Sequence, residues 1–337
     1  MISVIIPCYN EEKYIGPFLE SLLHQTIGID NLEVIIVDGM SNDGTRKILK
    51  NYLNNQNILL IDNTERTVPF ALNKGIQYSH GDYIGLMGVH CKYPEDYFEK
   101  LYSAIRQYNA DCVGGASITR PARNTSLCSA IAIAGSNIFG VGNSRFRIGV
   151  TDIQEVDTVA FGLYRREVFD KYGYFDTALT RDQDDEYNAR LKKNNRKILL
   201  VPNVRIEYYA RDSKKKLFQM NYQYGLFKPL VAKKIGKPIS IRQIVPFLFV
   251  CWLLIGSIIS IFSKAMMIIN VGIALVYIGI SLAISLKEAL HVHDMKLIFI
   301  LPQIFFIQHF AYGCGYLSGI VYFLLLGREK VDLKVSR

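Results

Sequence analysis

The stretch LEVIIVDGMSNDGT, residues 32–45, changes character at Asp38. Its first half, Leu32–Asp38, is an apolar run that ends on one acid, and its second half is rich in Asp, Asn, Ser and Gly. A short apolar run of this kind is typical of a strand buried on both faces, whereas Asp and Asn favour turns and helix caps because they hydrogen-bond the nearby backbone. The stretch therefore predicts a strand, a turn and a helix that begins near Gly44.

The same alternation continues on both sides of this stretch. Apolar runs recur at Ile2–Pro7, Ile58–Ile61 and Tyr83–Met87, and helical stretches recur at Glu12–Gln25, Gly44–Asn54, Phe70–Ser79 and Tyr97–Tyr108. Strands that alternate with helices predict an α/β domain with a parallel sheet covered on both faces. Ligands of such sheets bind beyond the carboxyl ends of the strands. The loops after Pro7, Asp38 and Met87 should therefore form one crevice. The polar residues expected there are Asn10, Glu11, Asp38, Asp43 and His90.

The last part of the 337-residue chain is much more apolar than the rest. Residues 1–240 mix charged and apolar positions and predict one domain. Residues 241–327 hold three apolar segments, Ile244–Phe262, Ala265–Leu286 and Leu297–Leu326. The first two approach the ~20 residues that cross a bilayer core of ~30 Å, and the third is too long for one simple crossing. Because such runs are rare in soluble cores, we expect a membrane region of about three helices, followed by a polar tail, residues 328–337.

Basic residues predict how the chain lies in the membrane. Ten lysines and arginines lie between Arg205 and Arg242, against two acids, and the positive-inside rule keeps such a segment in the cytoplasm. We therefore expect a multi-pass protein of the cytoplasmic membrane with its N-terminal domain in the cytoplasm and the Ser263–Lys264 turn outside. The tail would also lie outside if the third segment crosses once, although it is itself basic. The net charge of +9 fits attraction to anionic lipid, and no pattern typical of nucleic-acid binding accompanies it.

Several motifs in order carry a resemblance to a known family. PCYNEE (residues 7–12), VDGMSNDGT (37–45) and ALNKGIQYSHGDYI (71–84) resemble the opening motifs of family 2 glycosyltransferases, which have a nucleotide-sugar-binding GT-A fold. FGVGNSRFR (139–147), VDTVAFGLYRREVF (156–169) and RDQDDEYNARL (181–191) are similar to the succinoglycan-type subgroup, membrane-attached enzymes of exopolysaccharide synthesis. The resemblance covers nearly the whole chain. It implies a Rossmann-like GT-A domain followed by transmembrane helices.

A nucleotide sugar presents a base, a ribose diol and a diphosphate. Its site needs an acceptor for the base imide and either donors or a metal ion for the phosphates. The resemblance implies that Asp38 contacts the base, whereas turn chemistry is the structural alternative for Asp38 and Asp43. For Arg66 and Asn73 the alternatives are a surface ion pair and a polar residue on a helix face. The residues expected to bind the donor are Pro7, Tyr9, Asn10, Glu11, Asp38, Asp43, Arg66, Asn73, Gly88 and Val89.

Three consecutive acids, Asp184, Asp185 and Glu186, lie at the start of a predicted helix. The helix dipole favours carboxylates there, and crowding of like charges can raise the pKa of one of them into the range of a general base. The resemblance implies that Asp184 is the catalytic base, while Gln183 stands where many relatives have glutamate. The structural alternative is a solvated acidic cap.

The strand Tyr83–Met87 ends without an acid that the resemblance calls for. Relatives usually have Asp-x-Asp or Asp-x-His there, and the first Asp helps to hold Mg²⁺ or Mn²⁺ against the donor diphosphate, but residues 88–90 read GVH. Because Mg²⁺ keeps several waters, we expect metal held by the diphosphate, His90 and a nearby carboxylate such as Asp184 or Glu186. An aspartate restored at residue 88 should then leave the enzyme active. The alternative is that fixed cations neutralise the diphosphate, and the candidates are Arg66, Arg181 and Lys228.

The implied reaction is inverting transfer of a hexosyl or N-acetylhexosaminyl group. The donor is expected to be a nucleotide-diphosphate sugar, UDP-linked, and the acceptor a polyprenyl-linked glycan, whose diphosphate the basic stretch Lys214–Arg242 would attract. Residues expected at the acceptor or diphosphate are Asp157, Arg181 and Lys228. Two alternatives stay open: a polyprenyl-phosphate sugar synthase with the same fold, and a catalytically silent membrane scaffold. The sequence leaves the donor sugar, the linkage and the oligomeric state open.

Overall fold

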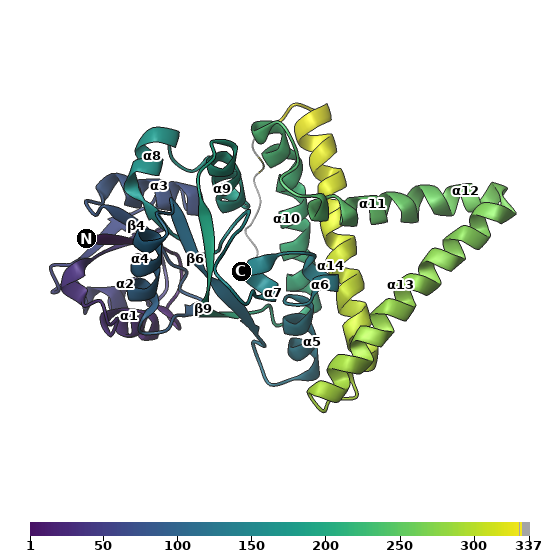
Figure 1. Ribbon diagram of the computed structural model, residues 1–337, viewed down its shortest axis with the longest axis horizontal. Coiled ribbons are helices and arrows are strands. Elements are labelled where there is room, and N and C mark those ends of the chain that lie inside the picture. The colour runs from purple at the N-terminus through teal and green to yellow at the C-terminus, as the bar shows by residue number, and fades with distance from the viewer. Residues whose placement is uncertain (330, 332–337) are drawn as a thin grey trace. The chain divides into compact units, whose positions relative to one another are not determined.

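The computed structural model describes residues 1–329 and residue 331, and the chain divides into two compact units (Figure 1). The first unit comprises Met1–Ile118 and Ile148–Tyr208, and the second comprises Thr119–Arg147 and Tyr209–Arg337. Compactness therefore groups residues 119–147 with the C-terminal helices, which the sequence did not predict. The assignment of residues 1–240 to the cytoplasm and 241–327 to the membrane stays a prediction. Most of the predicted tail, residues 328–337, lies outside the described residues.

A nine-stranded sheet with the order β3-β2-β1-β4-β8-β6-β9-β5 organises the first unit, and β7 pairs with β9. The strands are β1 (Ile2–Cys8), β2 (Leu32–Asp38), β3 (Ile58–Asp62), β4 (Tyr83–Leu86), β5 (Cys91–Lys92), β6 (Cys112–Arg120), β7 (Gln154–Glu155), β8 (Leu163–Arg165) and β9 (Ile198–Tyr209). The four strands predicted from apolar runs, β1 to β4, pair in parallel. The rest of the sheet contains antiparallel pairs, β4 against β8 and β8 against β6, so the expected parallel sheet is in fact mixed.

Helices cover both faces of the parallel half. Alternate residues of β1 point to opposite faces: Val4 and Ile6 join the core that α1 and α4 complete, whereas Ile5 meets α3. An ideal Cβ on Gly75 of α3 would lie 2.4 Å from Ile5 Cγ2, so this close approach of helix and sheet requires glycine. The helices of this unit are α1 (Ile15–Leu23), α2 (Thr45–Lys50), α3 (Val68–Tyr78), α4 (Tyr97–Gln107), α8 (Arg166–Tyr172) and α9 (Gln183–Lys193), with a 3₁₀ turn at Ile29–Asn31.

The second unit is helical. Its helices are α5 (Ser126–Ala134), α6 (Ile138–Val141), α7 (Arg145–Ile148), α10 (Lys214–Ile235), α11 (Val245–Cys251), α12 (Ser257–Phe262), α13 (Lys264–His291) and α14 (Leu297–Gly319). A 3₁₀ turn at Ile241–Gln243 precedes α11, a π-helical turn at Trp252–Gly256 joins α11 to α12, and another at Ile320–Leu325 extends α14. By length and composition three stretches suit a membrane span: Ile241–Phe262, Lys264–His291 and Leu297–Leu325. These agree with the three segments predicted from the sequence.

Candidate active site

The carboxyl ends of β1 and β2 lie side by side. Cys8, the last residue of β1, is in register with Asp38, the last residue of β2, and the Gly39 N–H donates to the Cys8 carbonyl over 2.7 Å. Two loops therefore leave the sheet at one point, the first leading to α1 and the second to α2. These loops and the ends of the two strands together carry six of the ten residues expected to bind the donor.

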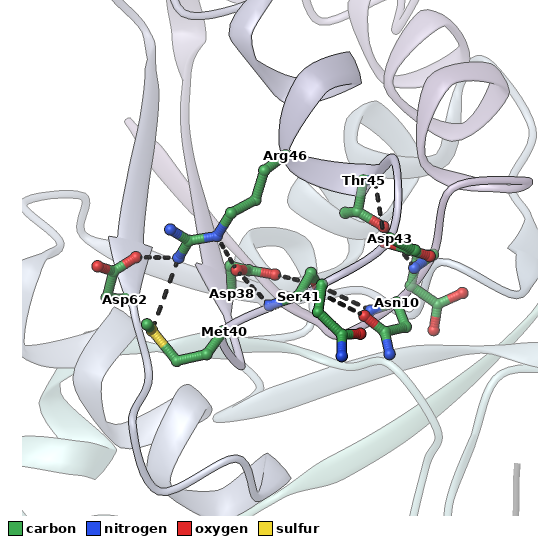
Figure 2. A network of polar contacts seen from close by, with 10 residues as sticks. Asn10, Asp38, Met40, Ser41, Asp43, Thr45, Arg46 and Asp62 are labelled. Carbon is green, nitrogen blue, oxygen red and sulfur yellow. Dashed lines mark hydrogen bonds and ion pairs between the residues drawn. The ribbon is translucent and has the colours of Figure 1, made fainter.

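Asp38 is the most enclosed of these residues, since its side chain has 0% exposure. Ser41 donates to it from the hydroxyl over 2.5 Å and from the backbone N–H over 3.0 Å, and Arg46 Nε donates over 2.6 Å (Figure 2). Arg46 also pairs with Asp62 at the end of β3, and its hydrogen bonds to Asp38 and Asp62 raise the pKa of the guanidinium. Asp38 thus holds the loop in place. Its contact with a base stays a prediction, and a base could reach the carboxylate only if Ser41 or Arg46 moved.

Side chains of each loop bind the backbone of the other. The Asn10 N–H donates to Ser41 Oγ over 2.8 Å, and Asn10 Oδ1 accepts from the Asn42 N–H over 2.9 Å (Figure 2). The Glu11 N–H donates to Thr45 Oγ1 over 2.7 Å. Asn10 has a φ of 54°, in the left-handed region that Asn tolerates better than most residues. The two loops therefore form one cross-linked wall.

Asp43 caps the turn into α2. Its carboxylate accepts from the Thr45 N–H over 3.0 Å and from the Glu12 N–H over 3.3 Å. Burial acts to raise the pKa of Asp43, but the hydrogen bonds from Thr45 and Glu12 outweigh it and hold the pKa below its usual value. The turn chemistry considered as the alternative for Asp43 is therefore present. Contact with the donor stays a prediction.

The remaining predicted donor residues of this region lie around the same strand ends. Pro7 pairs in register with Val37 and is half-buried. The Tyr9 side chain lies against Gly39, where an ideal Cβ would be 3.2 Å from Tyr9 Cβ. Arg66 is exposed with a φ of 56°, beyond the end of β3. Arg66 is thus available to a ligand.

Gly88 follows β4, and an aromatic ring fills the space beside it. An ideal Cβ on Gly88 would lie 2.7 Å from Phe161 Cε1. The Gly88 N–H donates to the Tyr93 hydroxyl over 2.8 Å, and the Tyr93 and Phe161 rings meet edge to face. Val89 is buried in the hydrophobic core, so its side chain does not face a ligand. An aspartate at residue 88 would therefore require the Phe161 ring to shift, and the expectation that it would leave the enzyme active stays a prediction.

His90 lies beside a different acid from the two predicted. Its Nε2 is 3.0 Å from Glu11 Oε1, and its ring meets Tyr14 edge to face at 4.6 Å. Residues 1–329 and 331 bring no three His, Cys, Asp or Glu side chains together as a metal site would. Glu11 and His90 nonetheless offer one carboxylate oxygen and one imidazole nitrogen in contact. This pair suits a cation whose other ligands are phosphate oxygens and water.

The three predicted acids lie in the first turn of α9 and have different surroundings. Glu186 is buried and accepts from Arg190 Nε over 3.0 Å and Nη2 over 2.5 Å, while Arg190 Nη1 donates to the Tyr172 and Tyr174 carbonyls. Glu186 therefore anchors α9 to the preceding loop. Asp184 and Asp185 are half-buried, and Asp184 Oδ1 accepts from its neighbour's N–H over 3.0 Å. These two remain as candidates for the base.

Polar contacts also fix α9 against β8. Asn188 is fully buried, accepts from the Tyr164 hydroxyl over 3.1 Å and donates to Thr158 Oγ1 over 2.8 Å. Burial raises the pKa of Tyr164. The helix that carries the predicted base is therefore held rigidly.

Asn73 makes a structural contact rather than a surface one. Its Nδ2 donates to the Phe175 carbonyl over 2.8 Å, and its Oδ1 accepts from the Phe175 N–H over 2.9 Å. The Asn73 side chain thus bonds both backbone groups of Phe175 and joins α3 to the loop before α9. A direct contact with the donor, predicted from the resemblance, would use the second amide N–H or the second lone pair of Oδ1 and stays a prediction.

We expect Asn73→Leu to lower the free energy of unfolding by about 1–3 kcal/mol, because two backbone groups of Phe175 lose their partner. Urea unfolding of the detergent-solubilised chain measures this loss, and titration with the free nucleotide measures donor affinity. Asn73→Asp keeps one acceptor and should lose less stability. If Asn73→Leu weakens nucleotide binding without lowering stability, the predicted donor contact is correct and the structural role is wrong.

The predicted acceptor residues are not gathered in one unit. Asp157 lies half-buried in the loop before β8, and Arg181 lies half-buried just before α9, both in the first unit. Lys228 lies in α10 of the second unit and is buried. Their roles stay predictions.

Three residues of the site were not predicted: Ser41, Arg46 and Phe161. Ser41 lies in the stretch quoted first, and Arg46 lies in α2. A buried carboxylate at a strand end requires hydrogen-bond donors, so Asp38 itself could have indicated that such residues lie nearby. Phe161 has a φ of 52°, and its carbonyl accepts a hydrogen bond from the Tyr97 hydroxyl. No local pattern places its ring beside a glycine far away in the sequence.

Comparison with known proteins gives a consistent result. The sequence profile described as Glycosyl transferase family 2 matches residues 3–173. The chain is similar to the dolichyl N-acetyl-alpha-D-glucosaminyl phosphate 3-beta-D-2,3-diacetamido-2,3-dideoxy-beta-D-glucuronosyltransferase of Methanococcus voltae, with 31% identity over 329 residues, which are 95% of this chain and 97% of the relative. It is 28% identical over 273 residues to the succinoglycan biosynthesis protein ExoA of Rhizobium meliloti, covering 80% and 81% of the two chains.

Among solved structures, the chain resembles the mannosyltransferase PcManGT from Pyrobaculum calidifontis in complex with GDP-Man and Mn²⁺. The TM-score is 0.62 at 16% identity, and the match covers 94% of this chain and 86% of that one. At this identity the likeness concerns the fold alone. It confirms the GT-A fold predicted from the motifs.

Proposed function

Because the chain belongs to glycosyl transferase family 2 and is a glycosyltransferase, we propose that it moves a sugar from a nucleotide-diphosphate sugar to a lipid-linked saccharide at a membrane. The observation that carries this proposal is the end-to-end similarity to a transferase whose name specifies a dolichyl-phosphate-linked N-acetylglucosamine acceptor. The three helices suited to a membrane support an acceptor held in a bilayer.

The proposed reaction is a single displacement with inversion. Asp184 takes the proton of an acceptor hydroxyl, the hydroxyl oxygen forms a bond to the anomeric carbon, and the bond from that carbon to the diphosphate oxygen breaks. Asp184 suits the role of base because Glu186 is engaged by Arg190 and the first turn of α9 is held rigidly. The nucleoside diphosphate leaves with the bonding electrons, so charge develops on its oxygens.

We place the nucleotide at the wall formed by the loops after β1 and β2. Tyr9, Asn10 and Arg66 are at least partly accessible there, whereas Asp38 and Asp43 hold the loops. GT-A transferases commonly use a divalent metal ion, and here Mg²⁺ or Mn²⁺ would be held by Glu11 and His90 together with the diphosphate. Such an ion supplies charge that stabilises the leaving group.

A transfer assay tests this function. We expect the full chain in lipid vesicles, given a panel of nucleotide sugars, to add one sugar to a polyprenyl-phosphate-linked N-acetylglucosamine and to release one nucleoside diphosphate for each product. Bare polyprenyl phosphate should remain unmodified in the same vesicles, as mass spectrometry of the lipids would show. Modification of the bare phosphate would identify a polyprenyl-phosphate sugar synthase instead. Absence of nucleoside diphosphate release with every donor of the panel would leave only the scaffold hypothesis.

A further inference from the structure

We propose that only the hairpin formed by α11, α12 and α13 enters the bilayer, and that α14 does not cross it. The chain after α14 then returns to the side of the membrane on which α10 lies. The proposal concerns the second unit and is independent of the proposed reaction.

The hairpin has the surface of a membrane-inserted element. Its outward side chains are large and apolar, and they are strongly exposed toward its tip, for example Ile261 at 76%, Phe262 at 85% and Ile268 at 68%. In Figure 1, α11 and α12 run away from α14 and α13 returns toward the start of α14. Soluble proteins do not leave so large a contiguous apolar surface in water, and a bilayer is the partner that covers it on all sides.

Several polar groups near the turn between the two arms pair with one another. Asn270 of α13 accepts from Trp252 Nε1 over 2.7 Å, and its Nδ2 donates to the Gly256 carbonyl over 2.5 Å and to Ser260. Gly256 permits this approach, since an ideal Cβ there would lie 2.8 Å from Asn270 Oδ1. A lipid environment requires such internal pairing because it offers no hydrogen bonds. Lys264 is the one charged side chain at the tip, where it can reach the far headgroups.

The length of the hairpin also fits. The first arm has 18 residues from Val245 to Phe262, or about 27 Å at 1.5 Å per residue. The second arm begins at Lys264 and contacts α14 from Tyr277, whose hydroxyl is hydrogen-bonded to His309 Nδ1 over 2.9 Å. The first arm over its whole length approaches the ~30 Å of a hydrocarbon core, and its first turns pack on α14 at Gly313.

α14 is more deeply covered by protein than the hairpin is. In the most apolar part of α14, 39% of the stretch is buried, against 11% and 6% for the corresponding parts of the two arms of the hairpin. Gly315 and Gly319 bring α10 into backbone contact, since ideal Cβ atoms there would lie 2.1 Å from the Tyr222 carbonyl and 2.2 Å from the Leu226 carbonyl. Gly313 does the same for α11 at Pro246. One side of α14 is therefore covered by α10 and α11.

The neighbour of α14 is unsuited to a bilayer core. α10 runs beside it from the Lys214 Nζ contact with Gln303, at 2.7 Å, to the Lys233 Nζ contact with the Phe323 carbonyl, at 3.3 Å. Over this length α10 carries six lysines, and one of them, Lys228, lies in its middle. Charged side chains at the bilayer centre are costly, so α10, and with it α14, belongs at or outside the interface.

The middle of α14 also binds an irregular segment. Gln308 Nε2 donates to the Gly140 carbonyl, and His309 Nε2 is hydrogen-bonded to the Phe139 carbonyl, both at 2.8 Å. These carbonyls belong to α6, which has four residues and is followed by Gly142 in a left-handed conformation. At its midpoint α14 therefore packs on this side against protein rather than against lipid.

This arrangement also resolves the charge of the tail. With two crossings the residues after Leu326, which include Arg328, Lys330, Lys334 and Arg337, lie on the same side as the basic stretch before α11. The positive-inside rule is then obeyed at both ends of the membrane region. Three crossings would place these four charges on the opposite side.

Two measurements on the full chain test the proposal. Green fluorescent protein and alkaline phosphatase are fused in turn after Arg337 in a bacterial host; we expect fluorescence and no phosphatase activity, which means a cytoplasmic tail. Phosphatase activity without fluorescence would establish a third crossing and overturn the proposal.

The second measurement uses Trp252, the only tryptophan of the chain, which lies near the middle of the first arm. In vesicles of lipids brominated near the acyl chain ends, Trp252 should lose most of its fluorescence. A variant with Trp252→Phe and Phe306→Trp moves the probe to an exposed position in the middle of α14 and should lose little. Equal quenching at both positions would show that α14 crosses the bilayer. Absence of quenching at Trp252 would show that a protein partner or a second copy covers the hairpin, and would also overturn the proposal.

Discussion

Asp184→Asn is expected to lower turnover by roughly 10²–10⁴-fold, the usual effect of losing a general base. The asparagine amide oxygen can still accept the Asp185 N–H bond that Asp184 Oδ1 accepts over 3.0 Å, so the first turn of α9 should keep its geometry. Affinity for the donor nucleotide should stay near that of the unaltered chain. Steady-state release of nucleoside diphosphate measures the first quantity, and nucleotide titration measures the second.

The neighbouring acids supply matched controls. Asp185→Asn changes the same charge one position along the helix and should leave turnover within a few-fold of normal. Glu186→Gln removes the charged partner of Arg190, whose guanidinium also donates to the Tyr172 and Tyr174 carbonyls. This variant should lower the stability of the chain more than it lowers turnover. A larger loss of turnover in Asp185→Asn than in Asp184→Asn would transfer the role of base to Asp185.

The parallel half of the fold was predictable because its signals are local. Leu32–Asp38 reads as a buried strand and is β2 with those bounds, and the register of Cys8 with Asp38 follows once β1 and β2 are parallel. The antiparallel pairs were not predicted. β5, β7 and β8 have two or three residues each, so no periodicity indicates them, and pairing with distant strands defines them.

The site was predictable in its residues and less so in their contacts. The ion pair of Glu186 with Arg190 connects residues four apart in a helix and could have been read from the sequence. The contact of His90 with Glu11 and the network of Asp38 with Arg46 depend on how separate loops meet. Hydropathy likewise identifies α14 as an apolar segment, but composition does not reveal that α10 packs along it.

Gly88→Asp is expected to lower both stability and turnover, contrary to the simple expectation that it restores a lost metal ligand. An ideal Cβ at this position would lie 2.7 Å from Phe161 Cε1 and 3.1 Å from Cζ, closer than real Cβ contacts allow. The Phe161 ring has little freedom to move, because its backbone is in the left-handed region and its carbonyl is bound by the Tyr97 hydroxyl. Overpacking of this kind typically costs about 1–3 kcal/mol. Thermal unfolding of the solubilised chain measures the cost.

Gly88→Ala separates the steric effect from the charge. It adds the same Cβ without a carboxylate, so it should lose most of the stability that Gly88→Asp loses. Phe161→Ala in either background removes the colliding ring and should restore much of that stability relative to Phe161→Ala alone. If Phe161→Ala does not rescue Gly88→Ala, the collision is not the cause of the loss.

The double variant Gly88→Asp with Phe161→Ala then shows what the missing acid means for the metal. The new carboxylate would lie just after β4, two residues before His90 in the sequence. It would add a hard oxygen ligand to the pair formed by Glu11 and His90. We expect half-maximal activity at a lower Mg²⁺ concentration than in Phe161→Ala alone, and EDTA should suppress the activity of both variants. Equal activity of the unaltered chain with EDTA and with Mg²⁺ would exclude the proposed metal. In that case the added carboxylate should slow the double variant, because its charge would repel the leaving diphosphate with no cation between them.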